Sequence, residues 1–265
     1  MKSVSIAAET HRRIPTKNWI HFFANRKNPS LVADLYRPAL ALTTRERRLI
    51  GRLRTPGAVQ RYLNRLPYNA AASPLTLRSF RGVVQHQSAH CLEAVLFTAT
   101  VLEQHGYPAT VMSFESVDNL DHVLFVYRNL GRWGAVARSR DPGLHGRRPV
   151  FRSAKALALS YVEPYVDLTG RITGYAVVDL AALGSYDWRL SQRNVWKVER
   201  LLLEYRHLRV QTPDKRINAW RERYQRFIER FPDAKPMFFK GQDTWGELPR
   251  RFRCVAGSGN TRRAW

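Results

Sequence analysis

The spacing of apolar positions changes along the chain and predicts where helices and strands lie. Apolar side chains recur at helical spacing in four segments, as on one buried face of a helix. These segments are residues 43–54, 55–66, 192–210 and 213–231. Within 92–102, apolar residues cover nearly every side of a helical wheel. The helix expected over 91–106 should therefore be buried by neighbours on all sides.

The starts of the first two helices carry capping residues. Thr43 or Thr44 precedes the first helix and Thr55 the second, and a threonine hydroxyl can accept a hydrogen bond from the first helical turn. Pro56 then stands at the first helical position, where a missing N–H costs nothing. We expect both helices to begin at these residues.

The middle of the chain combines strand and helix patterns. Short apolar runs bounded by turn residues predict extended segments at 109–114, 122–128, 132–139 and 169–180. Residues 149–166 are expected to form a helix. Together these elements predict an α+β fold, in which an antiparallel sheet packs on the buried helix that carries Cys91, with further helices at both ends of the chain.

The second and third predicted strands should form a hairpin. The turn between them contains Asn-Leu-Gly at residues 129–131. If Tyr127 faces Trp133 across that turn, then His122 faces Arg138. In this register Asp141, or Ser139 if the register slips, lies within one or two residues of His122.

The pattern divides the 265 residues into four parts. We expect an N-terminal helical arm over 1–72, which includes an aromatic segment at residues 18–26, and a core over 73–185. A C-terminal helical extension over 186–245 and a loosely ordered basic tail over 246–265 should follow. With 44% hydrophobic residues, the chain can build a sizeable core without cross-links.

The formal net charge of +23 is the strongest feature of the composition. Such a charge fits binding to nucleic acid or to an acidic partner. The basic residues are mostly Arg in short, scattered groups, however, and an Arg-rich proteome would give the same composition. No zinc-finger, RNP-like or helix-turn-helix pattern accompanies the charge, so it leaves a nucleic-acid-binding protein open without favouring one.

The two cysteines and the apolar stretches bear on localisation. Cys91 and Cys254 are far apart and form no disulfide framework, which is typical of a reducing compartment. The longest apolar stretch, 94–102, is too short to span a bilayer, and no targeting segment is evident. We therefore expect a cytoplasmic protein without a membrane span.

The stretch QHQSAHCLEA, residues 85–94, places Cys91 beside His86 and His90. The two histidines stand at helical spacing, which could place both imidazoles on one metal ion. They lack the intervening Glu of a zincin helix, and no second Cys/His cluster completes a site, so we predict no metal. A buried structural thiol stays open, because cysteine is among the most buried residue types.

Cys91, His122 and Asp141 form a third possibility, a nucleophilic site. A thiol at a helix start faces unpaired N–H groups and the positive end of the helix dipole, both of which stabilise the thiolate. An imidazole can accept the thiol proton and return it to a leaving group. A carboxylate on the other ring nitrogen would hold the imidazole in the correct tautomer.

These residues resemble the transglutaminase-like cysteine-enzyme superfamily. The resemblance rests on HCLEAVLFTATVLEQHGYPATVMSF followed by DNLDHVLFVYRNLGRWGAVARSRD, within about residues 76–152. It implies a papain-like or transglutaminase-like core, with Cys91 as nucleophile, His122 as general base and acid, and Asp141 as orienting acid. The family places its Asp directly after a Trp-containing strand, whereas Asp141 follows Trp133 by eight residues. Ser139 is therefore a possible substitute.

Other residues near this set have supporting or alternative roles. Gln85 could donate to an oxyanion together with the Cys91 N–H, and the alternative is a solvated loop residue. His90, Ser139 and Arg140 could line the substrate site. The basic segment 139–153, which also contains His145, Arg147 and Arg148, could bind an acidic group or simply form a solvated loop.

The sequence thus favours a cysteine-dependent acyl-transfer enzyme without metal or organic cofactor. Hydrolysis of an amide or peptide bond through a thioester is the expected reaction. A catalytically inactive transglutaminase-like binding or scaffold protein, and a basic nucleic-acid-binding protein, are the alternatives.

Overall fold

The computed structural model describes residues 40–70, 74–118 and 122–253. The expectations for the aromatic segment near residue 20, for Cys254 and for the end of the basic tail lie outside these residues. Among the described residues, no helix is long and apolar enough to cross a membrane.

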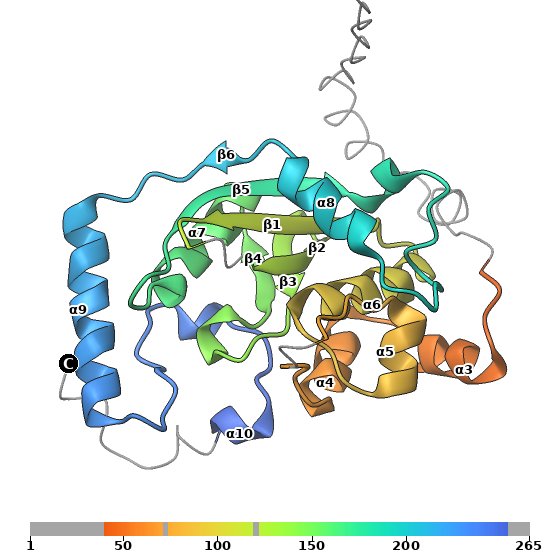
Figure 1. Cartoon of the computed structure of the whole chain (residues 1–265), viewed down its shortest axis with the longest axis horizontal. Helices are drawn as coiled ribbons and strands as arrows, with labels where there is room; N and C mark the ends of the chain where they lie inside the picture. The colour runs from red at the N-terminus through yellow and green to blue at the C-terminus, as the bar shows by residue number, and fades with distance from the viewer. Residues whose placement is uncertain (1–39, 71–73, 119–121, 254–265) are drawn as a thin grey trace, which may run out of the picture.

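A six-stranded antiparallel sheet forms the centre of the molecule (Figure 1). Its strands run in the order β4-β3-β2-β1-β5-β6. They are β1 (Thr110–Ser116), β2 (Val123–Asn129), β3 (Arg132–Val136), β4 (Arg147–Phe151), β5 (Ile172–Asp179) and β6 (Leu208–Arg209). Together with the helices around it, this sheet confirms the predicted α+β class.

The described helices precede, interrupt and follow the strands. They are α3 (Thr44–Arg52), α4 (Pro56–Arg65), α5 (Phe80–His86), α6 (Cys91–Glu103), α7 (Ala154–Tyr165), α8 (Trp196–Glu204), α9 (Asp214–Arg230) and α10 (Arg250–Arg253). Short 3-10 turns lie at η2 (Pro142–Leu144), η3 (Leu180–Leu183) and η4 (Gln242–Thr244). The predicted caps are confirmed, because Thr43 accepts from the Glu46 N–H and Thr55 from the Ala58 N–H.

Each face of the sheet carries its own hydrophobic core, because side chains alternate along a strand. On β2, Val123 and Phe125 pack with α3 to α6 and α8, whereas Leu124 and Val126 pack with α7. Figure 1 shows α3 to α6 grouped on one side of the sheet, with α9 along the opposite edge of the molecule. Helix α6 lies against β2, and every residue after Cys91 in this helix is buried.

Two of the predicted helices are wrong in extent. Residues 149–166 divide into the end of β4 and helix α7, because the Ser153 hydroxyl accepts from the Ala156 N–H and starts the helix there. The helix predicted over 192–210 is the shorter α8, and the chain then turns into β6, which pairs with β5.

The predicted hairpin is antiparallel as expected, but its register is wrong by one residue. Asn129 faces Arg132, so the turn holds only Leu130 and Gly131, both with positive φ (47° and 77°). Positive φ at both central residues is the requirement of a type I′ turn, which suits the twist of a hairpin. Tyr127 consequently faces Gly134 instead of Trp133.

The position opposite Tyr127 leaves no room for a side chain, which explains the glycine at residue 134. A Cβ at this position would lie 2.8 Å from the Tyr127 ring and 2.9 Å from the Pro149 backbone. Continued past the ends of the strands, the observed register brings Ser139, and not Arg138, level with His122.

Candidate active site

Cys91 is the first residue of α6 and is partly exposed. Its position is set by His90, which caps the helix: the His90 Nδ1 accepts from the Leu92 N–H at 3.2 Å. The thiol therefore lies at the end of the helix where N–H groups lack intrahelical partners, which favours a negative charge.

His122 directly precedes β2 and is brought to Cys91 by the sheet. Its backbone oxygen accepts from the Phe114 N–H at 3.0 Å, and its ring packs against Phe114 and Tyr161. The side chains of His122 and Cys91 are hydrogen-bonded. The structure thus brings together two residues that are 31 positions apart in the sequence.

The protonation of His122 follows from its second contact. Its Nε2 lies 2.8 Å from the Leu144 carbonyl oxygen, in the short turn η2. A carbonyl can only accept, so Nε2 carries the proton and Nδ1 is left as the acceptor that faces the thiol. The group that orients His122 in this structure is a backbone carbonyl.

The surroundings of Cys91 favour its thiolate. Burial raises the pKa of the thiol, but the hydrogen bonds from His122 and His90, together with their charges, outweigh burial and lower the pKa to about 6. The contact with His90 requires the same Nδ1 that caps the helix, so these two uses of His90 compete. The contact with His122 meets no such competition.

Tyr68 is a site residue that the sequence did not reveal. Residues 67 to 69 pair with Ala89 through a parallel bridge, which places Tyr68 beside Cys91. The Tyr68 hydroxyl accepts from the Cys91 N–H and donates to the thiol sulfur. Burial, followed by the charge of Cys91, raises the pKa of Tyr68, so the phenol keeps its proton and remains a donor.

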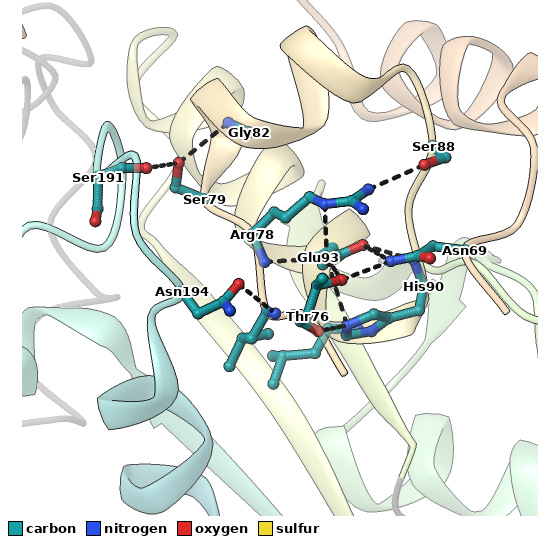
Figure 2. A network of polar contacts seen from close by, with 12 residues as sticks. Asn69, Thr76, Arg78, Ser79, Gly82, Ser88, His90, Glu93, Ser191 and Asn194 are labelled. Carbon is teal, nitrogen blue, oxygen red and sulfur yellow. Dashed lines mark hydrogen bonds and ion pairs between the residues drawn. The ribbon is translucent and has the colours of Figure 1, made fainter. Parts of the chain in front are cut away.

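A buried carboxylate, Glu93, ties the chain before the site to helix α6 (Figure 2). Its oxygens accept from Asn69 Nδ2, Thr76 Oγ1, the Arg78 N–H and the His90 N–H at 3.0 to 3.1 Å. The His90 Nε2 in turn lies 2.9 Å from the Thr76 carbonyl oxygen. This network, which we call the Glu93 network, holds His90 and the segment 69–78 against the start of α6.

Asp141 lies near the thiol but has another partner. It lines the same hollow as Cys91 and His122, and its carboxylate pairs with Lys235 Nζ at 2.9 Å. Ser139 is buried and Arg140 is exposed, and both line this hollow; their role as substrate-lining residues stays a prediction. The Ser139 hydroxyl accepts from the Asp141 N–H at 3.1 Å.

Gln85, predicted as an oxyanion donor, lies elsewhere. It is exposed on α5 and lines a separate hollow with residues of α3, including Glu46. The solvated state considered for it agrees with this placement, because the side chain is exposed and Cys91 does not line the same hollow. Its closeness to Cys91 in the sequence is lost because Gln87 ends α5 in a left-handed conformation (φ 52°) and the chain turns there.

In the basic segment after β3, Arg140 and Arg148 are exposed, but His145 and Arg147 differ from the expectation of a solvated or anion-binding loop. His145 and Arg147 are buried. Arg147 donates to the carbonyl oxygens of Gly143 and Ser160 and lies over the Tyr161 ring, 4.0 Å from its centre. A guanidinium with these backbone partners is part of the packing around η2, where Leu144 lies.

Two hollows meet at Cys91 and Tyr68, which line both. The first, here called the His122 hollow, has a volume of about 120 Å³ and includes His122, Asp141 and Tyr165. The second, here called the His90 hollow, has a volume of about 410 Å³ and includes His90 and several leucines. The thiol therefore lies at the junction of a smaller polar hollow and a larger one.

The described residues contain no cluster of three or more His, Cys, Asp or Glu side chains suited to a metal ion. His86 is exposed on α5, and His90 uses both ring nitrogens on backbone groups of its own surroundings. The arrangement around Cys91 is thus that of a thiol between two imidazoles and a phenol.

Comparison with known proteins adds little to this geometry. No family model matches the chain, and no curated protein matches it. Among solved structures, Legionella pneumophila LapG and its EGTA-treated form are similar with a TM-score of 0.32, at 11% and 13% sequence identity, over 60% of this chain and 94% of theirs. A similarity at this TM-score supports no conclusion about the chain, so its function is inferred from the site itself.

Proposed function

We propose that this protein is a cysteine-dependent acyl-transfer enzyme that hydrolyses amide or peptide bonds through a thioester on Cys91. The observation that carries the proposal is the hydrogen-bonded pair of Cys91, at the start of a buried helix, and His122. The resemblance of the sequence to the transglutaminase-like superfamily, with its papain-like core, agrees with this pair. A thiol activated by an imidazole at a helix N-terminus is the arrangement that nucleophilic catalysis requires.

The reaction follows from the protonation states of the pair. His122 Nδ1 takes the Cys91 proton, and the thiolate sulfur forms a bond to the substrate carbonyl carbon. The tetrahedral intermediate then expels the amine, which leaves with the proton returned by His122. Water, deprotonated by His122, attacks the thioester and releases the carboxylic acid and the free thiol.

The oxyanion of the intermediate requires hydrogen-bond donors close to the sulfur. We assign this role to the Cys91 N–H and the Tyr68 hydroxyl, which are hydrogen-bonded to each other in this structure. A substrate oxygen would take the Cys91 N–H from Tyr68, and the phenol would then turn its own proton toward that oxygen. Tyr68 replaces Gln85 in this proposal.

The Leu144 carbonyl holds the imidazolium that forms during the reaction, through its contact with His122 Nε2. Asp141 is the orienting acid that the family resemblance implies. Its pair with Lys235 gives the carboxylate a different partner in this structure, so we assign the primary orienting role to Leu144.

Alkylation of Cys91 by iodoacetamide over a pH series tests the proposal. The hydrogen bonds favour the thiolate, so the folded protein should lose the thiol proton near pH 6 and label rapidly above it. An ordinary cysteine titrates at about pH 8.5. His122→Ala removes one of these bonds and should move the midpoint upward. Peptide mass spectrometry separates the label on Cys91 from that on Cys254.

Exposed His86 offers a matched control, because His86→Ala should leave the midpoint unchanged. A second readout is a burst of p-nitrophenolate from p-nitrophenyl acetate, with an acetyl group on Cys91 and none in Cys91→Ser. A wild-type midpoint at the value of an ordinary thiol, or a midpoint insensitive to His122→Ala, would contradict the activated pair.

A further inference from the structure

The His90 hollow has a composition that the reaction itself does not explain. Beside Cys91 it is lined by apolar side chains from α8, from the start of α6 and from the segment before α5: Leu75, Leu77, Leu92, Trp196, Leu202 and Leu203. Three of these remain largely exposed at its rim, at 67% for Leu75, 42% for Trp196 and 62% for Leu203. A group of exposed large apolar side chains around a hollow is typical of a binding surface.

The position of His122 decides which part of a substrate lies in this hollow. The leaving amine must take its proton from His122, and His122 lines the other hollow. The leaving group therefore extends into the His122 hollow. The acyl group, which stays bonded to the Cys91 sulfur, must extend to the opposite side, where the His90 hollow begins.

We propose that the His90 hollow is the specificity subsite for a large apolar side chain on the acyl side of the bond that is cleaved. This inference rests on the proposed function. The occupant is a peptide or acyl amide whose side chain next to the attacked carbonyl is of the size of leucine or phenylalanine.

Size and chemistry agree with this occupant. A volume of about 410 Å³ lies within the usual range of ligand pockets, about 300–1,000 Å³. Glu199 is the single acidic side chain in the described lining, and it is exposed on the same helix face as Trp196 and Leu203, so an acidic side chain would be disfavoured. Apolar contact with Leu75 and Leu203 would remove two exposed side chains from water.

Chloromethyl ketones of N-acetyl-leucine and N-acetyl-glycine test the subsite. In both, the Cys91 thiolate displaces chloride and forms a carbon–sulfur bond, so the two differ only in the side chain. Burial of one leucine side chain predicts that the leucyl probe reacts roughly 10- to 100-fold faster than the glycyl probe. Iodoacetamide, which has no such side chain, measures the thiol itself.

Leu203→Asp should remove most of the leucyl preference, because it places a carboxylate at the apolar rim. Leu208→Asp is the matched control, since Leu208 is similarly exposed (57%) but lies on β6, outside the hollow. Trp196→Ala gives a second rim variant, should the first change the fold. Iodoacetamide labelling should stay the same in all three.

The possible outcomes separate this inference from the proposed function. Loss of the leucyl preference in Leu203→Asp and Trp196→Ala, with iodoacetamide labelling intact, supports the subsite. Equal rates for the two ketones in the wild type, or a preference that survives both variants, overturns the subsite and leaves the activated thiol standing. Slow iodoacetamide labelling of wild-type Cys91 at pH 7 overturns the proposed function, and the subsite with it.

Discussion

The two sides of Cys91 carry a histidine each, but the histidines are held in different ways. On one side, the His90 Nδ1 accepts a hydrogen bond from the Leu92 N–H, and its Nε2 donates to the Thr76 carbonyl oxygen. On the other side, the His122 Nε2 donates to the Leu144 carbonyl oxygen, which leaves Nδ1 as the nitrogen for the hydrogen bond with the thiol. His90 therefore bonds backbone groups through both nitrogens in addition to its contact with the thiol, whereas His122 has a backbone contact at one nitrogen only.

This difference teaches which imidazole can act as the base. Protonation of His90 at Nδ1 would break the cap of α6 and leave the Leu92 N–H unpaired. Protonation of His122 at Nδ1 breaks no hydrogen bond, because the Cys91 thiolate that results accepts a hydrogen bond from the new Nδ1–H. We therefore propose that the His90 side of the site, with the Glu93 network, supports the start of α6 and that His122 is the base that moves the proton.

Replacement of each histidine should give the largest contrast between the two sides. His122→Ala should lower the rate of p-nitrophenyl acetate turnover by roughly 100- to 10,000-fold, the usual contribution of a general base. His90→Asn keeps a side-chain oxygen to cap the Leu92 N–H and should lower the rate far less. Steady-state kinetics checks both variants, and a larger loss in His90→Asn would reverse the assignment of the base.

Removal of the buried Glu93 carboxylate should destabilise the folded protein on the His90 side of the site. Glu93→Ala leaves the Arg78 and His90 N–H groups without their acceptor, and we expect a loss of about 3–5 kcal/mol in the free energy of unfolding. Urea denaturation measures this loss. Glu199→Ala, at an exposed acid on α8, is the control and should change stability by less than about 0.5 kcal/mol. Similar small losses in both variants would show that the network adds little.

The smallest effect is expected at Asp141. Because Leu144 holds His122 Nε2 and Lys235 pairs with the carboxylate, Asp141→Asn should reduce turnover only a few-fold. A carboxylate acting as the third member of a triad would give a loss of roughly 10,000-fold. The kcat of this variant therefore decides between the carbonyl and the carboxylate as the orienting group.

Local patterns predicted the elements that build the site better than the contacts within it. The helix caps at Thr43 and Thr55 could be predicted from the sequence, because a cap joins residues only three positions apart. The buried position of the helix after Cys91 was also readable, since it is apolar on nearly all sides. The hairpin register was not, because it depends on whether the turn contains two residues or three.

The residues that the sequence missed share a physical reason. Tyr68 reaches Cys91 through a bridge between segments 21 residues apart, and no local pattern marks such a pairing. The Leu144 group that holds His122 is a backbone carbonyl, which every residue has. Gln85 shows the converse, because it is close to Cys91 in sequence but lines a separate hollow beside α3.

The sequence by itself determined the α+β class, the capped helix starts and the placement of a cysteine where a buried helix begins, because these depend on periodicity and on neighbours within one helical turn. Only the tertiary structure decided which histidine nitrogen faces the thiol, which phenol joins it and what lines the two hollows. Those contacts join segments that are distant along the chain, and their geometry depends on the registers and turns that bring the segments together.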